Sequence, residues 1–252
     1  MLHKGLLIAL LGCSLLLSGC AQSVNNAPAG PEEVKAGQPT LDTSKCDEGK
    51  EWWRSSATPK RGGMGVLAAA PAAIDHLDVT SGGGAGARVY QELLVTRGCY
   101  TGDLTLVPYL AKSWQVSADG LTWTMQLRDD VKWQNIAPVN GRKFDSGDVK
   151  FTYDNELKGG VNRTYWEGVQ IDTPTPTSVV MRLKESDADF GLKIAKQLVL
   201  PHEVKEQNGD FKSLAIGTGP YIHKEYKSGI ERTLVRNPDY WEMGTDGKAL
   251  PY

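Results

Sequence analysis

The sequence predicts a mixed α/β fold, in which short strand pairs and amphipathic helices follow one another along the chain. Three observations carry this prediction. Residues 121–127 alternate apolar and polar side chains with a period of two, which is typical of a half-buried strand. Residues 146–157 repeat apolar side chains at helical spacing. Residues 221–226 and 231–236 are two strand-like stretches separated by a turn.

The first of these strands is expected to form a hairpin with residues 111–116. Between them, residues 117–120 read Ser-Ala-Asp-Gly, and Gly120 can adopt the positive φ that a tight reversal requires. The alternation after this turn predicts one buried face, made of Leu121, Trp123, Met125 and Leu127.

The helix at 146–157 has a start signal of its own. Asp145 is a suitable N-cap, and Asp148 three residues later suits the positive end of the helix dipole. Its predicted apolar face consists of Val149, Tyr153 and Leu157.

The remaining elements are read from shorter patterns. Residues 65–70 predict a buried strand, and residues 88–95 predict a helix because Val89, Leu93 and Leu94 are spaced by four and five. The other expected elements are strands at 131–133, 170–172 and 178–183 and a helix at 188–198, which Pro201 would stop.

The N-terminus resembles a targeting segment. Lys4 precedes an apolar stretch, residues 5–17, which is shorter than the roughly 20 residues that span a bilayer. The stretch ends in Leu-Ser-Gly-Cys, which resembles a bacterial lipobox. Residues 1–19 are therefore expected to be a lipoprotein signal peptide and Cys20 the lipid-modified residue. An ordinary secretory peptide followed by a chance cysteine is the alternative.

Residues 20–61 are expected to form the lipid anchor and a flexible tether, because the first half of this stretch is rich in Pro, Gly, Asn and Glu and lacks apolar periodicity. The globular part then covers residues 62–252. Besides Cys20, the mature chain keeps Cys46 and Cys99, and two thiols in an oxidising compartment lead to the hypothesis of a Cys46–Cys99 disulfide.

Several function classes lack support in the sequence. A net charge of −2 and the absence of a basic tract argue against nucleic acid as a partner. Two glycine patterns, at 63–68 and 82–87, satisfy a loose dinucleotide fingerprint but lack its order of strand, turn and helix. His76, His202 and His223 are scattered, and no G-x-S-x-G elbow is present. No cofactor and no metal site are therefore expected.

Residues 111–131, AKSWQVSADGLTWTMQLRDDV, resemble the signature of the family 5 extracellular solute-binding proteins. These are the capture subunits of peptide and nickel ABC importers. The resemblance continues in order along the chain: residues 106–111 look like the lead-in to the signature and residues 141–149 like the helix start that follows it. Residues 217–221 and 236–241 look like the family's G-T-G-P-[YF] and R-N-P-x-Y-W motifs.

The resemblance implies a periplasmic-binding-protein-like type II fold of which this chain is the first lobe only, with the second lobe missing. It implies a substrate-binding lipoprotein that captures oligopeptides outside the membrane and delivers them to the ABC permease. Such a protein is expected to be an extracytoplasmic, lipid-anchored monomer and no enzyme. Because two lobes together enclose the ligand, this chain alone is expected to bind peptide poorly.

Candidate ligand contacts in this lobe lie in two loops. They are the loop after the first strand, with Asp78, Thr80 and Ser81, and the turn with Gly217, Thr218 and Gly219. Backbone amides in such turns can bind an extended ligand without reading its side chains. Loops that merely connect strands are an equal alternative. For the whole protein, the alternatives are a binder of nickel chelate, haem or oligosaccharide, a lipid-anchored extracytoplasmic hydrolase, and a surface lipoprotein that contacts other proteins.

Overall fold

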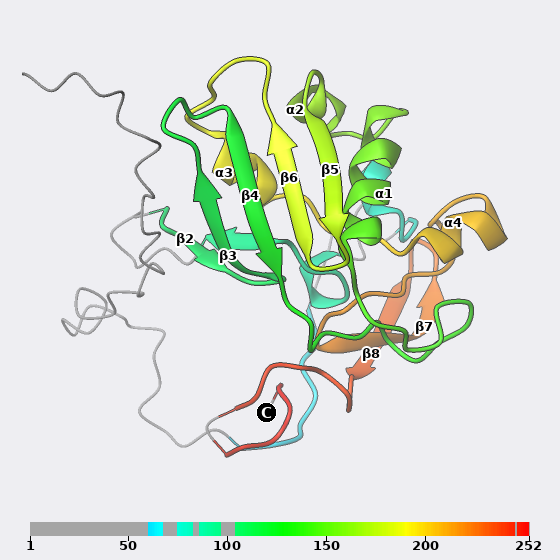
Figure 1. The fold of residues 1–252 in the computed structure, drawn as a ribbon. Coiled ribbons are helices and arrows are strands. Elements are labelled where there is room, and N and C mark those ends of the chain that lie inside the picture. Colours follow the sequence, from blue (N-terminus) through cyan, green and yellow to red (C-terminus); the bar gives the residue numbers. More distant parts are fainter. Residues whose placement is uncertain (1–59, 68–74, 83–85, 97–103, 245, 252) are drawn as a thin grey trace, which may run out of the picture. The chain divides into compact units, whose positions relative to one another are not determined.

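The fold was analysed in a computed structural model, which describes residues 60–67, 75–82, 86–96, 104–244 and 246–251. All of these residues lie in one compact unit of the chain. Strands and helices mix along this part of the chain, as the sequence predicts (Figure 1).

The largest sheet has four antiparallel strands in the order β3-β4-β6-β5 (Figure 1). The strands are β3 (Ala111–Val116), β4 (Thr122–Leu127), β5 (Gln170–Thr175) and β6 (Ser178–Arg182). All four strands lie where strands were predicted, but β5 extends to Thr175, three residues beyond its predicted end. Strands β4 and β6 lie in the middle of the sheet.

The turn between β3 and β4 forms for the reason expected from its sequence. Gly120 has a φ of 74°, which a residue with a Cβ rarely adopts. The Asp119 carboxylate accepts hydrogen bonds from the Ser117 hydroxyl at 2.5 Å and the Leu121 amide at 2.9 Å, and so fixes the loop. Within β4, the alternate side chains Met125 and Leu127 are fully buried.

Helix α1 (Ser146–Leu157) begins with a capping box, which confirms the predicted start. The Asp145 carboxylate accepts a hydrogen bond from the Gly147 amide at 2.8 Å, and the Asp148 carboxylate accepts one from the Asp145 amide at 3.1 Å. The helix packs beside β5 and β6 (Figure 1).

The buried face of α1 differs from the predicted one at its C-terminal end. Val149 and Tyr153 are fully buried, as expected, but Leu157 is 38% exposed, so its predicted place on this face is wrong. The neighbouring Glu156 is 1% exposed instead. A charged side chain replaces an apolar one there because its carboxylate finds hydrogen-bond donors, described below.

Two shorter antiparallel strand pairs and several short helices complete the described part. The pairs are β1 (Leu94–Thr96) with β2 (Leu106–Pro108) and β7 (Tyr221–Lys227) with β8 (Glu231–Arg236). The helices are α2 (Arg163–Trp166), α3 (Phe190–Ile194), α4 (His202–Asn208), and the 3-10 turns η3 (Val79–Ser81) and η4 (Gly86–Arg88). Among the described residues, no helix has the length and apolar character needed to span a bilayer.

The prediction of a helix at 88–95 is wrong. The chain forms η4 and then β1 there, because distant segments use the backbone carbonyls that a helix would need. The carbonyl of Leu93 accepts from the amide of Ala111 at 2.9 Å, and the carbonyl of Gln91 accepts from the amide of Val199 at 2.9 Å. The apolar side chains Val89, Leu93 and Leu94 are still fully buried.

Three other predicted elements also change. Residues 65–67 form no strand and are exposed, and residues 68–70 lie outside the described residues. At 131–133 there is only an isolated bridge between Lys132 and Lys143. The helix expected at 188–198 shortens to α3, and Pro201 is the N-cap of α4, so this proline precedes a helix.

A row of aromatic rings connects the sheet to the helices. Trp123 of β4 packs edge-on against Phe190 of α3, with ring centroids 5.5 Å apart. Phe190 packs against Trp166 of α2 at 5.8 Å, and Trp166 against Tyr153 of α1 at 4.2 Å. Such edge-to-face pairs add about 0.5–1.5 kcal/mol each beyond the area they bury. This row fixes α1 and α2 relative to the sheet and so positions the site described next.

Candidate functional site

Three of the predicted ligand contacts share the turn η3. Asp78 is its N-cap, and its carboxylate oxygen Oδ1 accepts hydrogen bonds from the backbone amide of Thr80 at 2.9 Å and the hydroxyl of Thr80 at 2.7 Å. Gly82 ends the turn with a φ of 89°. Asp78 and Thr80 are buried, whereas Ser81 is exposed. The sequence therefore places a carboxylate and two hydroxyl side chains in one short turn.

The loop after α1 covers this turn. The backbone amide of Val161 donates to the carbonyl of Thr80 at 2.8 Å. In the last turn of α1, the Glu156 carboxylate accepts from the backbone amide of Asn162 at 3.2 Å. Burial raises the pKa of Glu156, and the negative charge of Asp78 raises it further. Two carboxylates from distant parts of the sequence therefore face one buried region.

Side-chain amides complete this region. Gln197 donates from Nε2 to Glu156 Oε1 at 3.3 Å, and its Oε1 accepts from the indole of Trp166 at 3.1 Å and from Asn162 Nδ2 at 3.4 Å. Glu156, Gln197 and Trp166 are each at most 2% exposed. We call Asp78, Thr80, Glu156, Asn162, Trp166 and Gln197 the acid–amide cluster.

The charge of the acid–amide cluster has no cationic partner among the described residues, where no Lys, Arg or His side chain is hydrogen-bonded to Asp78 or Glu156. The hydroxyl of Tyr153 next to Glu156 is buried and has no hydrogen-bond partner in this part of the chain. Burial, and then the charge of Glu156, raise the pKa of this tyrosine. The cluster can therefore stabilise a positive charge.

The other predicted contacts, Gly217, Thr218 and Gly219, form a tight turn before β7. The amide of Gly219 donates to the carbonyl of Val89 at 2.8 Å, and the amide of Gly217 donates to the side chain of Gln134 at 3.3 Å. Thr218 is 1% exposed. Both glycine amides are thus already used within the chain, and the turn holds the segment that follows η4.

The structure therefore separates the six predicted contacts into two groups, one on η3 and one on the turn before β7. It adds four residues that the sequence did not single out: Glu156, Asn162, Trp166 and Gln197. The predicted lipidation site and disulfide, Cys20 and the pair Cys46–Cys99, lie outside the described residues.

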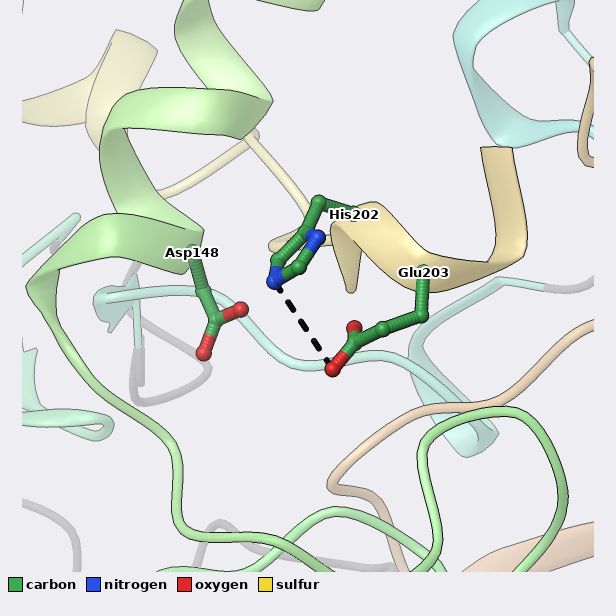
Figure 2. A group of neighbouring side chains, drawn as sticks. All are labelled: Asp148, His202 and Glu203. Carbon is green, nitrogen blue, oxygen red and sulfur yellow. Dashed lines mark ion pairs between the residues drawn. The ribbon is translucent and has the colours of Figure 1, made fainter. Parts of the chain in front are cut away.

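A second cluster has the residue types of a metal site. Figure 2 shows Asp148 of α1 converging with His202 and Glu203 of α4, and one ligand atom from each lies within 4.8 Å of the others. The Arg142 guanidinium already binds both carboxylates. It donates to the two Asp148 oxygens at 2.6 and 2.8 Å and to Glu203 Oε2 at 2.8 Å.

Burial by itself would lower the pKa of Arg142, but the hydrogen bonds to Asp148 and Glu203 outweigh it and raise this pKa. Burial by itself would raise the pKa of Glu203, but the hydrogen bond with Arg142 outweighs it and lowers this pKa. Trp133 adds a hydrogen bond from its indole to Asp148 at 3.0 Å. A metal ion at this cluster would need the negative charge of Asp148 and Glu203, which the guanidinium already neutralises. We therefore interpret the cluster as an ion-pair network that joins α1 to α4.

The chain matches one protein-family model and several known proteins. The family model of bacterial extracellular solute-binding proteins, family 5 Middle, matches residues 105–252. A nickel-binding periplasmic protein of Escherichia coli (strain K12) is 32% identical over 148 residues, which are 56% of this chain and 28% of that protein. Di/tripeptide-binding protein 2 of Pseudomonas aeruginosa (strain UCBPP-PA14) is 29% identical over 198 residues, which are 69% of this chain and 37% of that protein.

Solved structures agree with the sequence matches. An ABC transporter-associated periplasmic binding protein of Helicobacter pylori, in complex with the peptide STSA, superposes with a TM-score of 0.54 at 26% identity. The match covers 68% of this chain and 37% of that one. The chain thus spans about a third of the length of the relatives it matches. It belongs to the bacterial extracellular solute-binding proteins of family 5, and its described part has the mixed α/β fold of the family's periplasmic binding proteins.

Proposed function

We propose that the protein is the substrate-binding component of an ABC importer, which captures oligopeptides outside the membrane and delivers them to the permease. Family membership over residues 105–252 is the observation that carries this proposal. Peptide is our first substrate class, because a di/tripeptide-binding protein and a structure with a bound peptide are among the relatives. Proteins of this family bind solutes for transport and are not enzymes.

The described part would supply one wall of the binding site. A small ligand is held tightly when most of its surface is removed from water, which one open surface does not achieve. This chain spans about a third of its relatives' length. We therefore propose that tight binding requires a second wall and closure around the ligand.

On this wall, we propose that Asp78, Thr80 and Ser81 of η3 contact the ligand. The buried charge of Asp78 and Glu156 favours a cationic group there, and a peptide offers one in its terminal ammonium. Gly217, Thr218 and Gly219 would act by position, because their turn holds the chain next to η4 while its glycine amides stay bound within the protein.

A binding assay on the product of the complete reading frame tests the proposal. Native mass spectrometry of protein purified from its host would show the ligand it carries, and calorimetry would then measure di-, tri- and longer peptides. We expect a peptide-sized ligand and micromolar or tighter binding. Failure to bind any peptide in a folded, ligand-stripped protein would contradict the peptide assignment. Submicromolar binding by the 252-residue chain alone would contradict the need for a second wall.

Nickel chelate is the second candidate, because one relative is a nickel-binding periplasmic protein. The same calorimetry with a nickel–histidine complex separates the two. Binding of the complex but of no peptide would favour nickel transport.

The membrane attachment forms a separate part of the proposal. We propose that Cys20 carries the lipid anchor, that residues 20–61 tether a monomer outside the membrane, and that Cys46 pairs with Cys99. Mass spectrometry of the N-terminal peptide would detect the diacylglyceryl group, and Cys20→Ala should release the protein from the membrane. Titration of two free thiols in the unreduced mature protein would reject the disulfide.

A further inference from the structure

The hairpin of β7 and β8 has two faces of different character. On the exposed face, Lys227 forms ion pairs with Glu225 at 3.2 Å and with Glu231 at 2.6 Å. On the other face, Tyr226 is the cross-strand partner of Arg232, and His223 is the partner of Leu234. Charge is therefore compensated on the exposed face, and the inner face carries an arginine and a histidine.

The arginine on the inner face lacks a counter-ion among the described residues. Arg232 Nη1 is buried and has no hydrogen-bond partner there. Burial lowers the pKa of Arg232, and the positive charge of Arg88 at the end of η4 lowers it further. Two guanidinium groups therefore repel each other at a site where one of them is partly removed from water. An unpaired charge in such a place is unfavourable unless an anion joins it.

His223 adds hydrogen-bonding capacity to the same place. Both of its ring nitrogens are buried and lack partners in the described part of the chain. Burial, and then the charge of Arg232, lower the pKa of His223 to about 4. The imidazole is thus neutral at neutral pH, and its N–H can donate a hydrogen bond without adding to the repulsion.

The hairpin is hydrogen-bonded at both ends to the segments next to the proposed ligand contacts. At the tip of the hairpin, the Ser228 hydroxyl donates to the carbonyl of Asp75, just before η3. At its base, the amide of Gly219 donates to the carbonyl of Val89, just after η4. The hairpin is therefore tied at its tip to Asp75 and at its base to Val89, which directly follows Arg88 in the chain.

We infer that Arg88 and Arg232, with His223 as a further donor, form an oxyanion site that binds a carboxylate of the transported guest. The inference rests on the proposed function, because an unmodified linear peptide carries a carboxylate at its C-terminus. A guanidinium presents paired N–H donors that match the two oxygens of a carboxylate, and the anion would neutralise the repulsion between the arginines. With the acid–amide cluster, the lobe would then recognise both charged ends of a zwitterion.

The test compares one peptide as its free acid and as its C-terminal amide, in calorimetry on the product of the complete reading frame. Arg232→Gln and Arg88→Gln each remove one charge from the site. Lys227→Gln is the matched control, because it removes the same charge from the opposite face of the same hairpin. We expect the unmodified protein and Lys227→Gln to bind the free acid at least tenfold more tightly than the amide. Arg232→Gln should reduce this preference to less than threefold.

Equal affinity for acid and amide in the unmodified protein, or an unchanged preference in Arg232→Gln, would overturn the inference. If no peptide binds at all, the proposed function fails, and sodium acetate then probes the site by itself. A rise in the melting temperature with acetate over equal sodium chloride, lost in Arg232→Gln and kept in Lys227→Gln, would support an oxyanion site.

The carboxylate could also come from elsewhere in the same chain. In that case Arg232→Gln should shift the unfolding equilibrium by more than tenfold towards the unfolded state, and acetate should have no effect on the unmodified protein. That pair of results would overturn the assignment to the guest.

Discussion

The carbonyl oxygen of Val89 occupies the space in which a side chain on Gly217 would begin. A Cβ built on Gly217 would lie 1.8 Å from this oxygen, and one on Gly219 would lie 2.5 Å from it. Backbone atoms on both sides leave nothing flexible to move away. The G-T-G turn thus requires its glycines for close packing of two chain segments, whatever the ligand is.

We therefore expect Gly217→Ala to lower the free energy of unfolding by about 2–3 kcal/mol, because the segments must separate to admit the methyl group. Urea unfolding followed by tryptophan fluorescence would measure the change. Gly65→Ala is the control, since no atom lies within 4 Å of a Cβ built there, and it should change stability by less than about 0.5 kcal/mol. Equal urea midpoints for the two variants would show that the turn accommodates the added methyl group without loss of stability.

The ion-pair network at the start of α1 gives a second prediction. Arg142→Met keeps much of the side-chain volume but leaves the carboxylates of Asp148, 1% exposed, and Glu203, 18% exposed, without their cation. Removal of one partner from a buried ion pair destabilises a protein by about 3 kcal/mol. We expect a loss of about this size in urea unfolding.

Arg163→Met is the matched control for this variant. Arg163 pairs with Glu167 at 3.2 Å on the surface, with both side chains 55% exposed, and such pairs contribute about 0.5 kcal/mol or less. A similar loss in both arginine variants would mean that the network at α1 contributes no more than a surface pair.

The parts of the fold that the sequence predicted correctly are those with local signals. Residues 121–127 alternate strictly, Gly120 follows a turn sequence, and Asp145 with Asp148 forms a capping box, so each pattern needs only its neighbours to act. At 88–95, the spacing of Val89, Leu93 and Leu94 correctly predicted that these side chains are buried. It also predicted an α-helix, which does not form there. Hydrogen bonds to residues more than a dozen positions away decide that segment.

The acid–amide cluster could not be predicted for the same reason. Glu156, Asn162 and Gln197 are polar residues at the ends of helices, where side chains usually face water. The burial of Glu156 and Gln197 and the partial burial of Asn162 depend on contacts between residues 35 and 41 positions apart, namely Asn162 with Gln197 and Gln197 with Glu156. Only Asp78, Thr80 and Ser81, next to one another in the sequence, could be grouped in advance.

Glu92 provides a prediction about pH. Burial raises its pKa from 4.5 to about 7, so the folded protein binds a proton that the unfolded chain releases. Stability should therefore fall as the pH rises from about 4.5 to about 7 and then level off. Glu92→Gln should flatten this part of the profile and stabilise the protein at pH 8 by about 3 kcal/mol, because a rise in pKa from 4.5 to about 7 corresponds to that free energy at about 1.4 kcal/mol per pKa unit.

Urea unfolding at a series of pH values measures the effect of Glu92→Gln. The control is Glu185→Gln, which removes an exposed carboxylate and should leave the shape of the profile unchanged. A profile for Glu92→Gln that runs parallel to that of the unmodified protein would show that Glu92 keeps an ordinary pKa.

His223 should titrate at a pH well below that of an ordinary histidine. Burial, and then the charge of Arg232, lower its pKa from 6.5 to about 4. Between these two pH values the unfolded chain binds a proton at His223 that the folded protein does not bind. Stability should accordingly fall as the pH drops from about 6.5 towards 4. NMR of the imidazole carbons follows this directly, because His76 and His202 are the only other histidines after residue 3. Arg232→Gln should raise the pKa of His223, because it removes the nearby positive charge. Lys227→Gln should leave the pKa of His223 unchanged. A His223 pKa that does not respond to Arg232→Gln would mean that burial alone sets it and that the guanidinium lies too far away to share an anion with the ring.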